Sequence, residues 1–407
     1  MIKLLRIDSI ERARKELEAV GINRSAVHIM EGKPICYAIK VKSCKFFHAN
    51  VVKQEALALG IDCAVHKGVV TAKTEFTDCL ILGDLKRLYK LSEKLNSQNF
   101  KFLRKLSKEI KEALDNAVFK NPIFKFKDRL VEFKDNFMIM GILNITPDSF
   151  SDGGDFFSPD RALFRVEEMI GEGADIVDVG GESTRPFSEP VSVDEELNRV
   201  VPVVEAIKRR FPDILVSVDT YKAKVAEEVL KIGVEIINDI SGLGFDEALG
   251  GVLAGSDCGI VEMHIKGTPK SMQENPHYDD LIGDINSRFG EILEKLDRLR
   301  VERDRVILDP GIGFGKKLHH NLEILNNINS LKIWGRPILV GTSRKSFIGG
   351  ITGVKEPKNR LFSTVSSNVL AYTKGARLFR VHDVRANREA LAVAQAILNE
   401  QLSPSSQ

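Results

Sequence analysis

The chain has 407 residues, 43% hydrophobic and 29% charged, which indicates a globular protein with a buried core and room for two or three domains. It has no apolar run of about 18 residues, the length that a membrane span needs, so we expect no membrane partner. Five cysteines, an odd number, and an N-terminus without the apolar block of a secretory signal predict free thiols and a cytoplasmic location.

Charge is distributed unevenly, although the formal net charge is only +2. Residues 1–134 hold 27 Lys and Arg against 16 Asp and Glu, and the remaining residues hold 32 against 41. This shift predicts a domain boundary near residue 134. Because no nucleic-acid-binding motif is visible, we attribute the basic half to solvated lysines or to attraction between the halves, and we expect no nucleic-acid partner.

Residues 1–133 are predicted to form a small basic α/β domain of unknown role. Their pattern predicts helices at 10–20, 50–59 and 101–117 and strands at 26–30 and 34–41. Asn121 and Pro122 end the last of these helices and start a linker. Four possible zinc ligands have an irregular spacing that favours ordinary core or surface roles, namely Cys44, His48, Cys63 and His66.

Residues 134–402 repeat a strand followed by a helix eight times, and the tail 403–407 is predicted to be disordered. The strands are apolar on both faces, as buried parallel strands are, and are predicted at 137–146, 174–181, 215–220, 235–241, 259–264, 306–310, 337–342 and 378–382. Eight such units favour a closed (β/α)8 barrel, the TIM barrel, over an open doubly wound sheet. Pro202 lies inside one helix pattern and predicts a kink or a later helix start.

Every strand ends on polar residues. Parallel strands closed into a barrel present their C-terminal ends on one rim, so we expect these residues to surround one pocket. They are Asn144, Asp178, Asp219, Asn238 with Asp239, His264, Asp309, Ser343–Lys345, and Arg380 with His382.

Three of these residues offer mainly hydrogen-bond acceptors. Asp219, Asn238 and Asp309 suit a flat heterocycle that carries several N–H donors and a carbonyl group. Buried carboxylates are costly without a partner, so the substrate or Lys345 must pair with them. A purely structural ion network is the alternative.

A second group is cationic. Arg185, Arg380 and His382, together with Asn144, suggest a diphosphate site at the last strands of the barrel and the helix N-terminus that follows them. Asn144 could contact a phosphate oxygen or hydrated Mg²⁺. The alternatives are that Asn144 pairs only with loop backbone, and that the arginines pair with nearby acids, Asp178 or Asp383.

Two loops stand out by composition. Residues 144–154 form an unusually long connection of small and polar residues, which is typical of a lid over a substrate, as is the loop 180–186. Residues 309–316 contain a GxGxG without the further glycine of a dinucleotide-binding fingerprint. Those glycines are expected to let the backbone and Phe314 approach a ligand closely.

The sequence blocks at these positions resemble bacterial dihydropteroate synthase. In chain order the blocks are MGILNITPDSFSDGG, ADIVDVGGESTRP, SVDT, INDISG, MHIKGTP, DPGIGFGK, GTSRKSFIG and RVHDV, spread over residues 137–385. The resemblance implies a cytoplasmic transferase of folate biosynthesis and a sulfonamide target. It would use Mg²⁺ to join 6-hydroxymethyl-7,8-dihydropterin diphosphate to p-aminobenzoate, with release of pyrophosphate. The resemblance does not extend to residues 1–133.

The resemblance also implies a role for each matching residue. Pterin binding falls to Asp219, Asn238, Met263, Asp309, Lys345 and Arg380, and diphosphate binding to Asn144, Arg185, Arg380 and His382. The p-aminobenzoate contacts are Thr184, Arg185, Pro186, Phe314, Ser343 and Lys345, and Asn144 lies near the metal. The implied catalytic residues are Asp219, Asp309, Lys345, Arg380 and His382.

The implied mechanism is a dissociative substitution, in which pyrophosphate leaves before the amine attacks and Asp219 and Asp309 stabilise the pterin cation. Two other functions are weighed against it: a methyltetrahydrofolate-dependent corrinoid methyltransferase and a non-catalytic pterin-binding protein. The methyltransferase has no need for Arg185, Arg380 and His382. The resemblance further implies a homodimer that binds small-molecule substrates.

Overall fold

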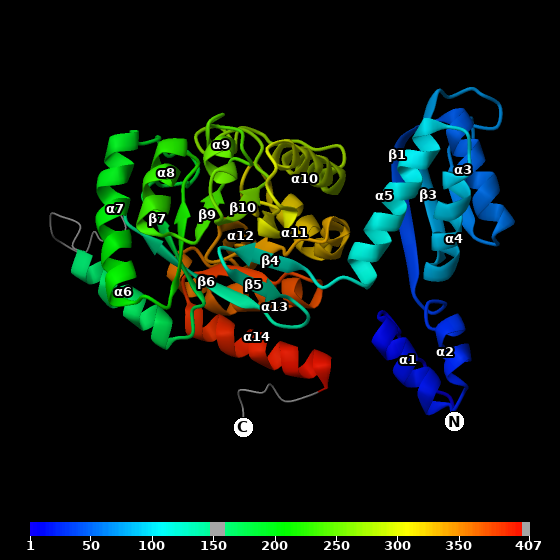
Figure 1. The fold of residues 1–407 in the computed structure, drawn as a ribbon, viewed down its shortest axis with the longest axis horizontal. Helices are drawn as coiled ribbons and strands as arrows, with labels where there is room; N and C mark the ends of the chain where they lie inside the picture. Colours follow the sequence, from blue (N-terminus) through cyan, green and yellow to red (C-terminus); the bar gives the residue numbers. More distant parts are fainter. Residues whose placement is uncertain (147–158, 401–407) are drawn as a thin grey trace. The chain divides into compact units, whose positions relative to one another are not determined.

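The computed structural model describes residues 1–146 and 159–400 (Figure 1). The chain divides into two compact units, Met1–Lys120 and Asn121–Gln407. Within the described ranges, no helix combines the length and the apolar character that crossing a membrane requires.

The first unit is a small α/β domain with a three-stranded antiparallel sheet in the order β1-β3-β2. Its elements are α1 (Ile10–Ala19), α2 (Arg24–Met30), β1 (Cys36–Lys45), α3 (Phe46–Ala58), β2 (Asp62–Val65), β3 (Phe76–Asp84), α4 (Leu85–Asn96) and α5 (Lys101–Val118). Alternate strand residues face a core that includes Cys44, Cys63 and Cys79. All five cysteines are free thiols.

Two expectations for this unit need comment. Residues 26–30 form part of helix α2 and not a strand, because a short apolar run fits both periods and only Val27 is buried in this segment. No group of His, Cys, Asp or Glu side chains in the described ranges is arranged to hold a metal ion. Cys44 and Cys63 contact Cys79 instead.

The expected boundary at residues 133 and 134 is too late. The hairpin of β4 (Ile123–Phe126) and β5 (Arg129–Glu132) belongs to the second unit. Phe124 and Phe126 are buried at the start of the barrel, and a Cβ atom on Gly259 would lie 2.3 Å from the Phe124 ring. The Lys127 ammonium donates to the Gly233 carbonyl at 2.6 Å. The hairpin therefore closes the N-terminal end of the barrel.

The second unit is a (β/α)8 barrel, as the alternating pattern predicts. Its parallel strands are β6 (Met138–Asn144), β7 (Ile176–Gly180), β8 (Leu215–Asp219), β9 (Ile236–Asp239), β10 (Gly259–Met263), β11 (Val306–Asp309), β12 (Leu339–Val340) and β13 (Leu378–Val381). They are hydrogen-bonded in the order β11-β10-β9-β8-β7-β6-β13-β12. A parallel bridge between Leu308 and Ile338 joins β11 to β12 and closes the ring.

Helices surround this ring (Figure 1). They are α6 (Pro159–Gly171), α7 (Val193–Arg210), α8 (Ala223–Ile232), α9 (Leu249–Ala254), α10 (Leu281–Arg298), α11 (Leu318–Asn326), α12 (Ser346–Thr352), α13 (Leu361–Thr373) and α14 (Val384–Asn399). Helix α7 runs through Pro202 without a later start. Its N-cap is Ser192, whose side chain accepts from Glu195 N.

Alternation along the strands produces two cores. Outward residues such as Val177, Val216 and Ile260 pack under the helices. Inward residues such as Ile176, Leu215 and Ile307 form an apolar layer with the three phenylalanines of the hairpin segment, Phe124, Phe126 and Phe133. This layer fills the part of the barrel at the N-terminal ends of the strands. Inward polar residues are therefore confined to the C-terminal ends.

Two outward-facing acids are buried beneath α10. Asp239 accepts hydrogen bonds from Ser241 N at 2.7 Å and Leu243 N at 2.6 Å, and its carboxyl group contacts that of Glu262. Burial and the neighbouring Asp239 raise the pKa of Glu262 well above its ordinary value, although Arg288 and Lys295 oppose the shift. Burial and the neighbouring carboxylate therefore both disfavour the ionised form of Glu262.

We predict that Phe124→Ala destabilises the barrel by about 3–5 kcal/mol, because it removes a large buried side chain and leaves a cavity. Trp334, the only tryptophan, lies in the barrel and reports its unfolding in urea by fluorescence. Leu130→Ala on the same hairpin is the matched control, because Leu130 is 61% exposed. Equal midpoints for the two variants would show that the hairpin does not support the barrel.

The acid pair predicts a pH dependence of stability. The Glu262 carboxyl group has a raised pKa in the fold, so its contribution is complete below its unfolded pKa and is lost as pH rises towards the folded value. Glu262→Gln keeps the size and shape of the side chain and removes the titration. Above pH 5 the wild type should lose unfolding free energy relative to this variant, by up to about 1.4 kcal/mol per pH unit. Glu294→Gln on the exposed face of α10 is the control, and parallel pH profiles for all three proteins would contradict the raised pKa of Glu262.

Candidate functional site

The inward polar residues meet at the C-terminal end of the barrel. Asp178 on β7, Asp219 on β8, Asn238 on β9 and Asp309 on β11 are all buried. Adjacent strands bring them into register, because Asp219 pairs with both Gly180 and Asn238, and Met263 pairs with Asp309. Met263 itself is 2% exposed. Four of the predicted pterin contacts therefore line neighbouring strands of one wall.

Arg380 on β13 reaches past β6 to the acids of β7 and β8. Its Nε atom donates to Asp178 Oδ2 at 2.6 Å and its Nη2 atom donates to Asp219 Oδ2 at 2.7 Å. The amide of Asn238 donates to the same Asp178 oxygen at 3.2 Å. The other oxygen, Asp178 Oδ1, is buried and has no hydrogen-bond partner among the described residues.

The sequence predicts Asp178 only as a polar residue at a strand end, and the predicted site residues do not include it. Strand alternation could have identified it, because Asp178 lies two residues after inward-facing Ile176. The same rule removes two candidates. Asp239 follows inward-facing Asn238 and so faces outward, and His264 contacts Asp284 of α10 at 3.4 Å. These two strand-end residues therefore do not join the pocket.

Burial sets the electrostatics of this group. It raises the pKa of Asp219 to about 7, with Arg380 opposing the shift. Burial also raises the pKa of Asp309, with Lys345 opposing it. The pKa of Lys345 falls to about 8 through burial, with Asp309 opposing it. Burial therefore disfavours the charged form of each of these groups, and their opposite charges offset that effect in part.

Lys345 lies at the start of α12, beside the glycine-rich loop. Its ammonium group donates to the Ile312 carbonyl and lies 4.6 Å from the centre of the Phe314 ring. Gly313 has φ of +83°, and a Cβ atom there would lie 3.2 Å from the Lys345 side chain. This close approach is the role expected of the loop glycines.

His382 and Ser343 form a second pair on the rim. The Ser343 hydroxyl accepts from His382 N at 3.1 Å and lies 2.9 Å from His382 Nδ1. Burial and then Arg344 and Arg380 lower the pKa of His382 to about 3, and Arg185 contributes in the same direction. His382 is therefore neutral, and Arg185 is close enough to act on it.

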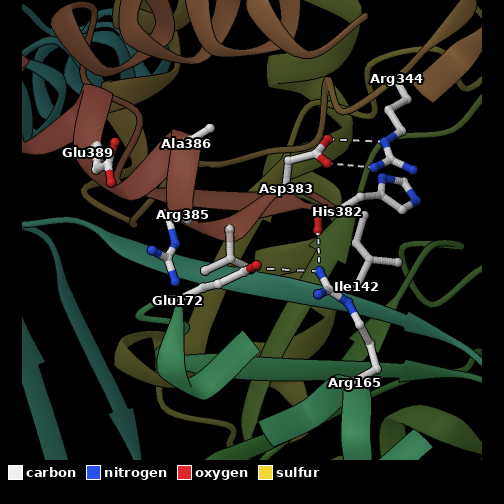
Figure 2. Close-up of a pocket in the computed structure, with 10 residues that line it drawn as sticks. Ile142, Arg165, Glu172, Arg344, His382, Asp383, Arg385, Ala386 and Glu389 are labelled. Carbon is white, nitrogen blue, oxygen red and sulfur yellow. Dashed lines mark hydrogen bonds and ion pairs between the residues drawn. The ribbon is translucent and has the colours of Figure 1, made fainter. Parts of the chain in front are cut away.

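A cavity of about 480 Å³ lies beside His382 at the start of α14 (Figure 2). Arg165 donates to the His382 carbonyl at 2.8 Å, and Arg344 forms an ion pair with Asp383 at 2.5 Å. Figure 2 shows these pairs, with Arg385 further along α14. Arginines thus gather at the rim beside a helix N-terminus.

The loop after β7 carries Thr184, Arg185 and Pro186, and the last two are exposed. Its base is held by Glu182, whose carboxylate accepts from Tyr221 OH at 3.0 Å, Lys222 Nζ at 2.6 Å and Val191 N at 3.1 Å. Its far end reaches the loop after β10, where Phe187 N donates to Pro269 O at 3.1 Å. The two loops meet across the ends of β8 and β9.

One of the ion pairs considered as an alternative to a diphosphate site is present. Arg380 does pair with Asp178, and Asp383 pairs with Arg344, not with Arg185. Asn144 lies at the end of β6, and its amide has no hydrogen-bond partner among the described residues. The greater part of the predicted lid 144–154 lies outside the described residues, as does the tail 403–407.

Comparison with known proteins identifies the family. A model described as pterin binding enzyme matches residues 140–382. Dihydropteroate synthase of Haemophilus influenzae is 44% identical over 261 residues, 64% of this chain and 94% of that protein. A crystal structure of Yersinia pestis dihydropteroate synthase with a sulfonamide drug complex is 41% identical, with a TM-score of 0.63, and the match covers 68% of this chain and 99% of that one.

A further relative includes the N-terminal unit. A probable bifunctional folylpolyglutamate synthase/dihydropteroate synthase of Halobacterium salinarum is 35% identical over 391 residues, 96% of this chain but 46% of that protein. The first unit thus has a counterpart within a larger protein. With the barrel, the inward acids and the matches over residues 140–382, the chain belongs to the dihydropteroate synthase family of pterin-binding enzymes.

Proposed function

We propose that the barrel condenses 6-hydroxymethyl-7,8-dihydropterin diphosphate with p-aminobenzoate to give 7,8-dihydropteroate and pyrophosphate. The observation that carries this proposal is the arrangement of Arg380. On one side it forms ion pairs with two buried acids. On the other side it adjoins a cationic cluster made of His382, Arg185 and Arg344. A methyltransferase would need the acids but not this second cluster, so the cluster favours the synthase.

The acid side is assigned to the pterin ring. Asp219, Asn238 and Asp309 offer acceptors to ring and exocyclic N–H groups, and Lys345 can donate to the ring carbonyl. Met263 supplies an apolar surface and Arg380 a planar cation that can stack on the ring. Asp178 Oδ1 adds one more buried acceptor without a partner among the described residues, which fits a ligand donor.

The cationic side is assigned to the diphosphate. Asn144, Arg185, Arg380 and His382 lie at the ends of β6, β7 and β13, which are neighbouring strands. Neutral His382 can donate a hydrogen bond to an oxyanion without adding charge.

The residues fit Mg²⁺ only as a metal shared with substrate. The described residues contain no cluster of acidic or imidazole ligands for a metal, whereas the Asn144 amide oxygen is a hard ligand of the kind that Mg²⁺ accepts. Mg²⁺ usually takes its other ligands from phosphates and water. Bound there with Asn144, it would neutralise charge on the leaving diphosphate.

The p-aminobenzoate end is assigned to the loops. Thr184, Arg185 and Pro186 come from the loop after β7, and Phe314, Ser343 and Lys345 from the loops after β11 and β12. Phe314 and Pro186 provide apolar surface for the benzene ring, while Arg185 and Ser343 can bind its carboxylate. We infer that sulfonamides, which resemble this substrate, compete here.

The proposed reaction is a dissociative substitution. The exocyclic C–O bond breaks first, and Arg185, Arg380 and His382 stabilise the departing diphosphate. Asp219 and Asp309 stabilise the positive charge that develops on the pterin. Lys345 fixes the ring, the amine nitrogen forms the new C–N bond, and its excess proton leaves to water.

The experiment is to mix the protein with the pterin diphosphate, p-aminobenzoate and Mg²⁺ and measure pyrophosphate. We expect turnover in the wild type and a loss of about 10²- to 10³-fold in kcat for Asp219→Asn, which keeps the shape and removes the charge. Asp213→Asn at an exposed position is the control. Absence of pyrophosphate in the wild type would refute the function, whereas full activity of Asp219→Asn would refute only the role of the charge.

We also propose that the barrel forms a homodimer through α13 and α14. Large apolar side chains are exposed on both helices, with Phe362 at 83%, Leu370 at 59%, Val393 at 60% and Ile397 at 69%. Apolar exposure of this extent is typical of an interface.

The dimer is tested by Leu370→Glu combined with Ile397→Glu. We expect the doubled mass in light scattering to fall to the monomer mass, because a dimer would bury these charges. Val20→Glu, at an exposed apolar position of the first unit, should leave the mass unchanged. A wild type of monomer mass would rule out this interface.

Two further assignments stay proposals. The unpaired thiols Cys44, Cys63 and Cys79 fit a reducing compartment, so we place the protein in the cytoplasm. For the first unit, we propose a scaffolding, regulatory or partner-binding role.

A further inference from the structure

The glycine-rich loop after β11 is held by side chains along its whole backbone. Four consecutive carbonyl groups each accept from a different residue. The Ile312 carbonyl accepts from Lys345 Nζ, Gly313 from Gln273 Nε2 at 2.7 Å, Phe314 from Lys316 Nζ at 2.9 Å and Gly315 from Tyr278 OH at 2.8 Å. Side-chain hydrogen bonds to its carbonyl groups therefore fix the position of this loop.

Two of these donors come from the loop after β10, which contributes none of the proposed aminobenzoate contacts. Gln273 and Tyr278 lie on it, and the two loops are in close contact. A Cβ atom on Gly311 would lie 2.0 Å from the His264 carbonyl oxygen, and one on Gly315 would lie 2.5 Å from that of Lys266. The glycine-rich loop thus follows the surface of its neighbour.

We infer that Gln273 and Tyr278 are positioning residues that hold Phe314 at the aminobenzoate end of the site. The inference rests on the proposed function. Gln273 holds the residue before Phe314 and Tyr278 the residue after it, so the Phe314 backbone is fixed on both sides. Lys316, 3% exposed, holds the Phe314 carbonyl itself.

Most of the pterin end is held by other bonds. Asp309 and Lys345 bond to the glycine-rich loop at Gly311 N and the Ile312 carbonyl, before the two carbonyl groups that Gln273 and Tyr278 hold. Asp178, Asp219 and Asn238 are held by Arg380 and by one another on β7, β8 and β9. Loss of Gln273 or Tyr278 should therefore affect the two substrates unequally. A residue that only stabilised the fold would affect both alike.

The chain permits mild substitutions. The Tyr278 ring packs edge-on against His320, with ring centres 5.0 Å apart, and Lys266 Nζ lies 4.4 Å from its centre. Tyr278→Phe keeps this packing and removes only the hydroxyl bond. Gln273→Met keeps the length of the side chain and removes the amide donor.

We expect each variant to raise KM for p-aminobenzoate by about 3- to 10-fold, the usual effect of one lost hydrogen bond. KM for the pterin diphosphate should stay within about twofold of the wild type. The matched control is Tyr89→Phe, which loses a comparable bond to Asp115 at 2.6 Å in the first unit and should change neither constant.

Hydrogen exchange provides a readout independent of turnover. Amides of residues 311–316 should exchange faster in Tyr278→Phe and Gln273→Met than in the wild type or Tyr89→Phe. Unchanged exchange, or equal increases of both KM values, would overturn the inference. If the wild type makes no pyrophosphate, the proposed function fails, and the exchange rates still decide whether these side chains hold the loop.

Discussion

The site depends on one guanidinium group held between two buried carboxylates. Arg380 reaches from β13 past β6 to Asp178 on β7 and Asp219 on β8, so it links strands that are not neighbours in the ring. A buried carboxylate without a partner costs several kcal/mol, and two acids share a single cation here. Burial raises the pKa of Asp219, Arg380 opposes the shift, and the neighbouring Asp178 adds to it. A ligand with N–H donors can pair with these acids, which connects the electrostatics of the fold to pterin binding.

The barrel accommodates these buried charges because it separates an apolar layer from a polar one. The hairpin phenylalanines and inward aliphatic residues fill the lower half, so water is excluded there and polar side chains are confined to the rim. The rim loops are then held by one another and not by the strands alone. Glu182 closes the loop after β7, and the loop after β10 contacts both that loop and the glycine-rich loop. In the proposed site, most pterin contacts would therefore come from strand ends, and the aminobenzoate contacts would come from loops that support one another.

The two units differ in how much of this logic applies to them. The first unit has a core and a sheet of its own, but its polar residues form no comparable buried cluster in the described ranges. Its three clustered thiols are buried, and burial with hydrogen bonding to Cys79 raises the pKa of Cys63. A raised pKa makes the Cys63 thiol a poor nucleophile, whereas hydrogen bonding to Cys79 lowers the pKa of Cys44. The match to the Halobacterium salinarum relative covers this unit as well as the barrel.

The sequence alone determined the barrel and most of its site. Runs apolar on both faces predict buried parallel strands. Because the C-terminal ends of such strands meet on one rim of a barrel, the sequence also predicts that Asp219, Asn238, Asp309 and Arg380 lie together. Local pattern failed where tertiary contacts decide. The segment 26–30 suits a strand as well as a helix, and the hairpin 123–132 joins the barrel only because Phe124 finds space beside Gly259. Likewise, which acid Arg380 selects, and which side chains hold the glycine-rich loop, are set by distances between residues far apart in the chain. No local periodicity encodes such distances, because they arise only when the ring of strands closes.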